Sequence, residues 1–158
     1  MSIALLGRLL YSVRVLSIIY RHLPNKLLDR PFYFDVRGRR LSHIEVGEIG
    51  ERIAVAYLRR SGRKVLYRNY RGPKGGELDI VARDRDFLCF VEVKARRRRL
   101  GSRPLDAVTP EKQELIERGA RSWLALLPHN DFQWRFDVVE VILEEGELPE
   151  VCVVEEAF

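Results

Sequence analysis

The sequence is poor in the residues that build disulfide frameworks and zinc sites. It contains two cysteines, Cys89 and Cys152, and three histidines, and none of them forms a Cys-x-x-Cys pair or a Cys/His cluster. These counts argue against a disulfide-stapled secreted domain and against a zinc centre, and they favour a reduced, cytoplasmic setting. Because Cys89 lies in an apolar stretch, we expect it to be a small buried side chain.

The sequence also lacks an uninterrupted apolar run of about 20 residues, which a membrane-spanning helix requires. Residues 1–20 are apolar and free of acidic residues, but Arg8 and Arg14 interrupt them and no small-residue cleavage site follows. They therefore fit neither a transmembrane helix nor a signal peptide. Three alternatives stay open: a helix that covers the domain's own core, one that contacts a partner protein, and one that lies on an anionic membrane surface.

No internal repeat or low-complexity segment divides the chain, and its 158 residues suit one domain with a substantial core. Hydrophobic residues make up 46% of the sequence and charged residues 32%, which is the composition of a folded protein. Residues 21–43 contain Pro24, Pro31 and Gly38 and are typical of a linker. The sequence thus predicts a basic, apolar extension with a helical segment over residues 1–43, and a domain over residues 44–158.

Charge is distributed unevenly along the chain. Residues 1–40 hold eight basic and two acidic residues, residues 41–129 hold nineteen and twelve, and residues 130–158 hold one and nine. A basic body with an acidic C-terminal part favours a polyanionic partner that binds away from that part. The alternative is that these charges only keep the surface solvated.

Hydrophobic periodicity predicts an α/β order of elements. The predicted elements are a helix over 44–60, strands over 64–70, 76–83 and 87–95, a helix that starts at Pro110 after an N-cap at Thr109, and strands over 135–143 and 151–154. The second and third strands are expected to form an antiparallel hairpin, and the third and fourth to run parallel through a right-handed crossover. The first helix is expected to bury Ile49, Ile53, Ala56, Tyr57 and Leu58, and Trp123 and Trp134 are expected in the core.

The strand over 76–83 combines apolar and acidic residues. Since successive side chains of a strand point to opposite faces, Leu78, Ile80 and Ala82 are expected on one face and Glu77 and Asp79 on the other. If the neighbouring strand pairs with it, the carboxylates of both strands come together. The sequence therefore predicts an acidic patch at this hairpin.

The strand over 87–95 places Glu92 and Lys94 on one face. Mg²⁺ favours one or two protein carboxylates together with water and substrate phosphate, and Mn²⁺ can take its place. We therefore predict a metal site formed by Asp79, Glu92 and the carbonyl of Val93, with Glu51 reaching it from the preceding helix. Lys94 would orient or deprotonate the attacking water, or stabilise developing phosphate charge. The alternative is that Glu92 and Lys94 form a plain surface ion pair.

Basic residues follow this strand directly and predict contacts with a phosphate backbone. The predicted nucleic-acid-binding residues are Arg96, Arg97, Arg98, Arg99, Arg103 and Lys112. Lys112 falls in the first turn of its helix, where a cation opposes the helix dipole, so phosphate binding competes with packing of its stem over the core. Glu77 and Gln113 are candidate supporting residues. Tyr67, Tyr70 and Arg71 either stack on bases or, as we favour for the two tyrosines, pack together.

The ordered set of motifs resembles the YraN-like family, which is grouped with endonucleases. The matching segments are Gly50-Glu51 with Ala54 and Tyr57-Leu58, Gly76 to Val81, Phe90 to Arg96, Val108-Thr109 with Lys112, Arg135 to Val139 and Ala157-Phe158. The family belongs to the PD-(D/E)XK restriction-endonuclease-like group and is similar to archaeal Holliday-junction resolvases. The resemblance covers about residues 44–158. It implies an α/β, restriction-endonuclease-like core, in which a central mixed sheet (an antiparallel meander plus a parallel crossover strand) is flanked by helices.

The resemblance also implies an activity, namely Mg²⁺-dependent cleavage of nucleic acid with DNA favoured and structure specificity open. By position, Asp79 corresponds to the metal-binding aspartate, Glu92 and Lys94 to the ExK pair, and Glu51 to the helix glutamate that completes the metal shell. Leu78 stands where the group's proline would precede the aspartate. The alternatives are a non-catalytic nucleic-acid-binding module with the same fold, and an interaction protein recruited through residues 1–20. A homodimer is a further expectation, because symmetric nucleases often use two sites.

Overall fold

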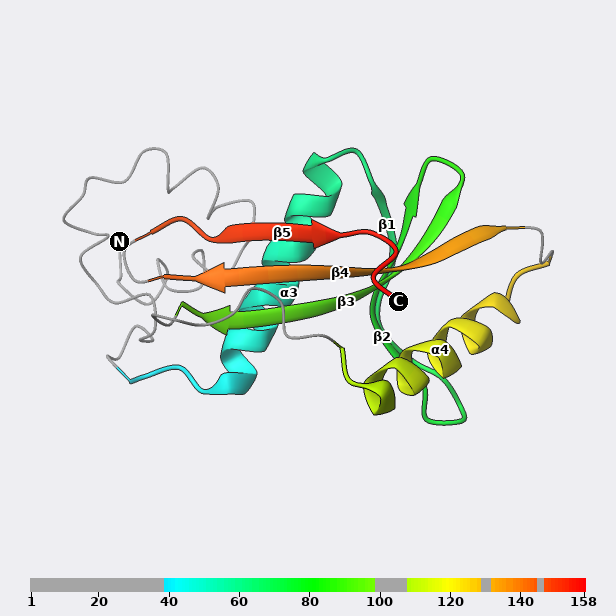
Figure 1. The fold of residues 1–158 in the computed structure, drawn as a ribbon, viewed down its shortest axis with the longest axis horizontal. Helices are drawn as coiled ribbons and strands as arrows, with labels where there is room; N and C mark the ends of the chain where they lie inside the picture. Colours follow the sequence, from blue (N-terminus) through cyan, green and yellow to red (C-terminus); the bar gives the residue numbers. More distant parts are fainter. Residues whose placement is uncertain (1–38, 99–107, 129–131, 145–146) are drawn as a thin grey trace, which may run out of the picture.

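The computed structural model describes residues 39–98, 108–128, 132–144 and 147–158 (Figure 1). The elements are α3 (His43–Arg60), β1 (Lys64–Arg71), β2 (Glu77–Asp84), β3 (Phe87–Arg97), α4 (Pro110–Leu124), β4 (Gln133–Leu143) and β5 (Glu150–Val154). This is the predicted order, with element ends shifted by a few residues at most. The predicted N-terminal extension lies outside the described residues, except for its last few positions.

One mixed sheet in the order β1-β2-β3-β4-β5 forms the centre of the domain. Strands β1, β2 and β3 form an antiparallel meander, β3 and β4 pair in parallel, and β5 returns antiparallel to β4. Helix α4 makes the crossover between the parallel pair (Figure 1). The predicted hairpin and the predicted parallel crossover are both confirmed, and so is the α/β class with helices flanking a mixed sheet.

Two hydrophobic cores lie on the two faces of this sheet. On one face, α3 packs against β2, β3 and β4 through Val46, Ala54, Val55 and Leu58. On the other face, α4 packs through Ile116 and Ala120 against a second set of buried residues that includes Phe90. Each fully buried aliphatic or aromatic side chain contributes about 1.5–3 kcal/mol to folding. A layer of helix on each face therefore fixes the position of the strands between them.

Capping residues mark the ends of both helices, and the cap at Thr109 with Pro110 was predicted. Ser42 caps α3 and forms a capping box with Glu45, while Ser61 and Gly62, with φ 90°, end it. The side chain of Thr109 accepts a hydrogen bond from the backbone N–H of Lys112 at 3.4 Å, and Pro110 occupies the first helical position. These caps fix where each helix begins, and hence where Glu51 and Lys112 lie.

Burial corrects two details of the expected core. Tyr57 is 41% exposed, because the buried stripe of α3 runs through Ala54 and Leu58 and leaves the tyrosine outside it. Trp134 is 46% exposed at the start of β4, although its ring contacts those of Phe90 and Phe136. Trp123 is partly buried against the α4-side core, and Cys89 is fully buried, as expected. Within the described residues no helix is both long and apolar enough to cross a bilayer.

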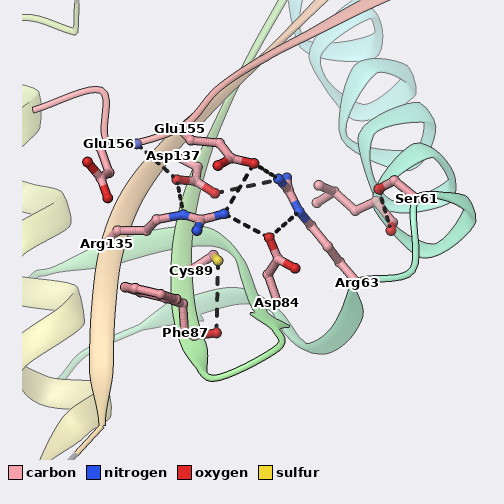
Figure 2. Close-up of polar contacts among 10 residues, drawn as sticks. Ser61, Arg63, Asp84, Phe87, Cys89, Arg135, Asp137, Glu155 and Glu156 are labelled. Carbon is pink, nitrogen blue, oxygen red and sulfur yellow. Dashed lines mark hydrogen bonds and ion pairs between the residues drawn. The ribbon is translucent and has the colours of Figure 1, made fainter.

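An ionic cluster centred on the buried Asp137 joins the ends of several elements (Figure 2). Arg135 of β4 donates to Asp137 and to Asp84 at the end of β2, each at 2.9 Å. Arg63, between α3 and β1, also pairs with Asp84 and with Glu155 after β5. The Asp137 side chain is fully buried and also accepts a hydrogen bond from a backbone N–H of the C-terminal segment. We call these five residues, Arg63, Asp84, Arg135, Asp137 and Glu155, the arginine cluster.

Candidate metal site

Asp79 lies where β2 and β3 separate. The described pairing of the two strands stops at Ile80 and Val91, and Asp79 is the next residue of β2. Its Oδ2 accepts a hydrogen bond from the backbone N–H of Val93 at 2.8 Å. Since the N–H and C=O of a strand residue point to the same edge, the carbonyl of Val93 is also directed towards this opening. The fork between the strands therefore brings together two of the predicted metal ligands.

The side-chain alternation of β2 changes at the same residue. Ile80 and Ala82 belong to the α3-side core, whereas Leu78 belongs to the α4-side core. The prediction that these three residues share a face is therefore wrong. A regular strand would place Leu78 and Ile80 together, so the strand is rotated at Asp79.

Asn69 is a site residue that the sequence reasoning missed. It lies opposite Asp79 in β1, between the registered pairs Arg68↔Ile80 and Tyr70↔Leu78, and its φ of 52° is in the left-handed region. Its side chain hydrogen-bonds the carboxyl group of Glu51 and so opposes the rise of the Glu51 pKa. Asparagine is rare in strands and tolerates this backbone conformation. An asparagine inside the predicted strand was therefore the available signal.

Two lysines hold the two oxygens of Glu92. The Glu92 side chain is buried, with Oε1 3.5 Å from Nζ of Lys94 and Oε2 3.3 Å from Nζ of Lys112. Lys112 also donates to Oε1 of Glu77 at 2.5 Å, so it bridges carboxylates of β2 and β3. The structure thus brings Glu77 and Lys112 to the site, while the predicted contact of Lys112 with phosphate stays a prediction.

The carboxyl groups of this site influence one another. Burial, and then the charge of Asp79, raises the pKa of Glu92 to about 7. Burial and the charge of Asp79 also raise the pKa of Glu51 on α3. The hydrogen bond from Lys112 lowers the pKa of Glu77. Asp79 is therefore within electrostatic reach of both other predicted carboxylate ligands.

The donor set fits a hard divalent cation. Asp79 and Glu92 offer carboxylate oxygens, and Oε2 of Glu92 is buried without a hydrogen bond, although it faces the ammonium group of Lys112. Among the described residues no three His, Cys, Asp or Glu side chains are already spaced to hold a metal. Mg²⁺ needs only one or two carboxylates when waters and phosphate complete its shell. Asp79 and Glu92 meet that need, with Glu51 and the Val93 carbonyl as further oxygen donors.

Gly50 lets α3 approach β3 closely at the residue before Glu51. A Cβ atom on Gly50 would overlap the Cβ of Ala95 in β3. Gly47, one turn earlier, has nothing within 4 Å of such an atom. The distance between α3 and the sheet at Glu51 therefore depends on the absence of a side chain at Gly50.

Gly50→Ala is expected to lower the free energy of unfolding by about 1–3 kcal/mol, because the added methyl group overpacks the interface between helix and sheet. The matched control Gly47→Ala adds the same group in open space, and we expect it to raise the free energy of unfolding by about 0.5–1 kcal/mol. Urea denaturation of both variants measures the difference. Equal effects of the two substitutions would contradict the close approach.

Two further glycines set the position of α4. A Cβ atom on Gly76, just before β2, would overlap the backbone of Gly119 in α4, and one on Gly119 would lie 3.0 Å from the carbonyl oxygen of Glu77. The backbones of helix and strand are thus in direct contact. Lys112 lies two turns before Gly119, so this contact determines how far its side chain must reach to Glu77 and Glu92.

The predicted arginine run is engaged with the protein's own oxygen atoms. The partners are Glu140 for Arg96 (2.7 Å), the carbonyl of Leu41 for Arg97, and Glu144 and Glu150 for Arg98. Gln113 donates to the carbonyl of Val108 at 3.0 Å, at the start of its own helix. Arg99 and Arg103 lie outside the described residues. The structure therefore shows contacts that order the end of β3, and binding of nucleic acid by this run stays a prediction.

Stability should depend on pH through Glu92. Its folded-state pKa of about 7 lies above the ordinary value of 4.5, so the folded protein favours the protonated form. The destabilising effect of ionised Glu92 is therefore absent well below pH 4.5 and grows as the pH rises to 7. Glu92→Gln is expected to raise the free energy of unfolding by about 2–3 kcal/mol at pH 8 and by much less at pH 4.5.

Urea denaturation in EDTA at the two pH values measures this effect. Glu114→Gln on the exposed side of α4 is the matched control, and we expect it to change stability equally at both pH values. An effect of Glu92→Gln that is the same at pH 4.5 and pH 8 would contradict the burial of an ionisable Glu92.

Comparison with known proteins places these residues in a family. The profile described as "Uncharacterised protein family UPF0102" matches residues 50–141. The chain belongs to the UPF0102 family. This confirms the resemblance to the YraN-like family at the level of the family. The matched segment includes Glu51, Asp79, Glu92 and Lys94 and begins after the N-terminal extension.

Curated relatives share most of their length with this UPF0102 chain. A UPF0102 protein of Acetivibrio thermocellus is 39% identical over 125 residues, which cover 77% of this chain and 96% of the relative. One from Trichlorobacter lovleyi is 42% identical over 114 residues (72% and 89%), and one from Pelobacter propionicus is 49% identical over 102 residues (63% and 72%). The similarity therefore extends over the domain rather than over one motif.

Proposed function

We propose that this UPF0102 protein is a metal-dependent nuclease that hydrolyses phosphodiester bonds of nucleic acid, with DNA favoured. The observation that supports the proposal is the meeting of Asp79, Glu92 and Lys94 at the fork between β2 and β3, with Glu51 in electrostatic reach. As part of the same proposal we assign the five-stranded mixed sheet and its flanking helices to the restriction-endonuclease-like fold.

The difficulty of the reaction is charge, because the nucleophile and the phosphodiester are both rich in negative charge. Mg²⁺ or Mn²⁺, when bound by Asp79 and Glu92, would reduce this repulsion and lower the pKa of water. The chain itself supplies orientation. The N–H of Val93 holds Asp79, and the two lysines hold opposite oxygens of Glu92.

The two lysines differ in access to a substrate. The side chain of Lys94 is 39% exposed and that of Lys112 is 22% exposed, and only Lys112 has a second carboxylate partner in Glu77. Lys94 is therefore the lysine with better access to a substrate: as an ammonium ion it would orient the attacking water or stabilise charge on the phosphate, and only its neutral amine could accept a proton from that water. Lys112 keeps Glu77 and Glu92 together.

A cleavage assay tests the proposal. The purified full chain is incubated with branched, flapped and single-stranded DNA in Mg²⁺, in Mn²⁺ and in EDTA, alongside Asp79→Ala and Lys94→Ala. We expect metal-dependent cleavage by the wild type and none above background by the variants. Cleavage that survives both substitutions, or that persists in EDTA, would contradict the proposed site.

One observation favours a second candidate, a nucleic-acid-binding module that keeps the fold without catalysis. Lys112 already pairs with Glu77 and Glu92, and within the described ranges no three-ligand cluster is preformed. Titration with Mn²⁺ separates the two candidates. A module of this kind would bind DNA in a salt-sensitive manner, with no change in affinity when the metal is added.

A further inference from the structure

The two edges of the sheet carry opposite charge. The edge strand β5 and the segment after it contain Glu150, Glu155 and Glu156 and no basic residue. The other edge strand, β1, and the turn that follows it contain no acidic residue between Arg63 and Gly76. We call the exposed Lys64, Arg68, Arg71 and Lys74 of this segment the β1 basic edge.

The β1 basic edge is unpaired, unlike most arginines nearby. Within the described part of the chain, none of its four residues forms an ion pair, whereas Arg63, Arg96, Arg98 and Arg135 all do. Intramolecular acids therefore pair with Arg96 and Arg98 of the predicted run and with the arginine cluster. The cations of the β1 basic edge have no such partner within the described residues, so they stay open to a polyanion.

The β1 basic edge also lies next to the candidate metal site. β1 pairs with β2 along the segment that contains Asp79, whose position in the register is opposite Asn69. The charges of Arg68 and Arg71 lower the pKa of Glu51 and of Glu77 respectively, so both arginines are within electrostatic reach of the site. Tyr67, in the same strand, is 48% exposed, and its ring packs against Tyr70 and Trp123 at 5.9 Å and 5.1 Å between centroids, so the favoured prediction of aromatic packing is confirmed.

We propose that the β1 basic edge is the surface that binds the phosphate backbone of nucleic acid and leads it to Asp79. The inference rests on the proposed function and names the surface that this function uses. Basic residues on an edge strand also protect it from pairing with other chains. Protection alone gives no affinity for nucleic acid, so a binding experiment distinguishes the two roles.

The test compares two triple variants with the same change in net charge. The first is Arg68→Gln/Arg71→Gln/Lys74→Gln. The control is Arg59→Gln/Arg60→Gln/Arg85→Gln, which removes three exposed arginines at the end of α3 and in the β2–β3 turn, at the other end of β2 from Asp79. Fluorescence anisotropy in EDTA measures the affinity of each full-length protein for labelled single-stranded and duplex oligonucleotides at several salt concentrations. Circular dichroism checks that both variants are folded.

We expect the first variant to bind nucleic acid at least about tenfold more weakly than the wild type. The slope of log affinity against log salt concentration should also become shallower by about 2–3 units, which is one unit for each lost phosphate contact. The control variant is expected to stay within about twofold of the wild type. Equal weakening of both variants would overturn the inference and leave the proposed function standing. A wild type that binds no oligonucleotide would overturn both.

Binding of the same proteins to anionic phosphatidylserine vesicles is the remaining measurement. If the first variant loses affinity for vesicles but keeps full affinity for oligonucleotides, the edge is a membrane-binding surface and the inference is wrong. Full affinity of the first variant for both partners would leave the edge with a protective role only, and would also overturn the inference.

Discussion

Asp79→Asn is expected to lower the rate of Mg²⁺-dependent DNA cleavage by about a thousandfold, which is the range found when one preorganised electrostatic contact of an active site is lost. Asparagine keeps an oxygen that can accept the hydrogen bond from Val93, so the fork between β2 and β3 is expected to persist. What the variant loses is a negative charge and a metal ligand. Single-turnover cleavage with excess protein measures the chemical step.

The same variant has a second readout that does not depend on activity. Because the charge of Asp79 raises the pKa of Glu92 and of Glu51, its removal should lower both pKa values. Asp86→Asn, an exposed change in the β2–β3 turn, is the matched control and should cleave like the wild type. Undiminished cleavage by Asp79→Asn would show that the catalytic site does not include Asp79.

Arg135→Met is expected to lower the free energy of unfolding by about 3–5 kcal/mol, the cost of removing one partner of a buried charge. The side chain of Arg135 is 10% exposed and pairs with Asp84, Asp137 and Glu155. Without it, the fully buried Asp137 keeps Arg63, at 3.9 Å, one backbone N–H and the thiol of Cys89. Urea denaturation at neutral pH measures the loss.

Two further variants show whether the buried charge of Asp137 causes the loss of stability in Arg135→Met. Arg121→Met removes an exposed i,i+4 pair with Glu117 and is expected to cost no more than about 0.5 kcal/mol. Arg135→Met/Asp137→Leu removes the stranded carboxylate as well and should recover much of the lost stability. A double variant as unstable as Arg135→Met would point to lost packing of Arg135 against Phe87 instead.

The element order could be predicted because its signals are local. Thr109-Pro110 marks a helix start, Ser61-Gly62 a helix end, and a two-residue turn, Arg85-Asp86, joins β2 to β3. A hairpin fixes the register of its strands, so the neighbourhood of Asp79 and Glu92 followed from sequence spacing. Short-range patterns therefore placed the elements and this pair of acids correctly, although they misplaced Leu78 and Tyr57.

The rest depends on irregular backbone or on distant partners. A rule that assumes regular alternation of side chains cannot predict the rotation of β2 at Asp79. This rotation occurs opposite Asn69, whose backbone is in the left-handed region. Arg96 and Arg98 find their partners more than forty residues further along the chain, so their spacing alone suggested free charge. The bridge from Lys112 to Glu77 and Glu92 likewise depends on how α4 packs on the sheet.

The contact between Gly76 and Gly119 has a consequence for the evolution of this domain. In most packed interfaces a larger residue on one side can be accommodated by a smaller one on the other side. For Gly76 the obstacle to a side chain is the main chain of Arg118 and Gly119, which every amino acid possesses. No second substitution can relieve it, so lineages that keep this placement of α4 should keep Gly76.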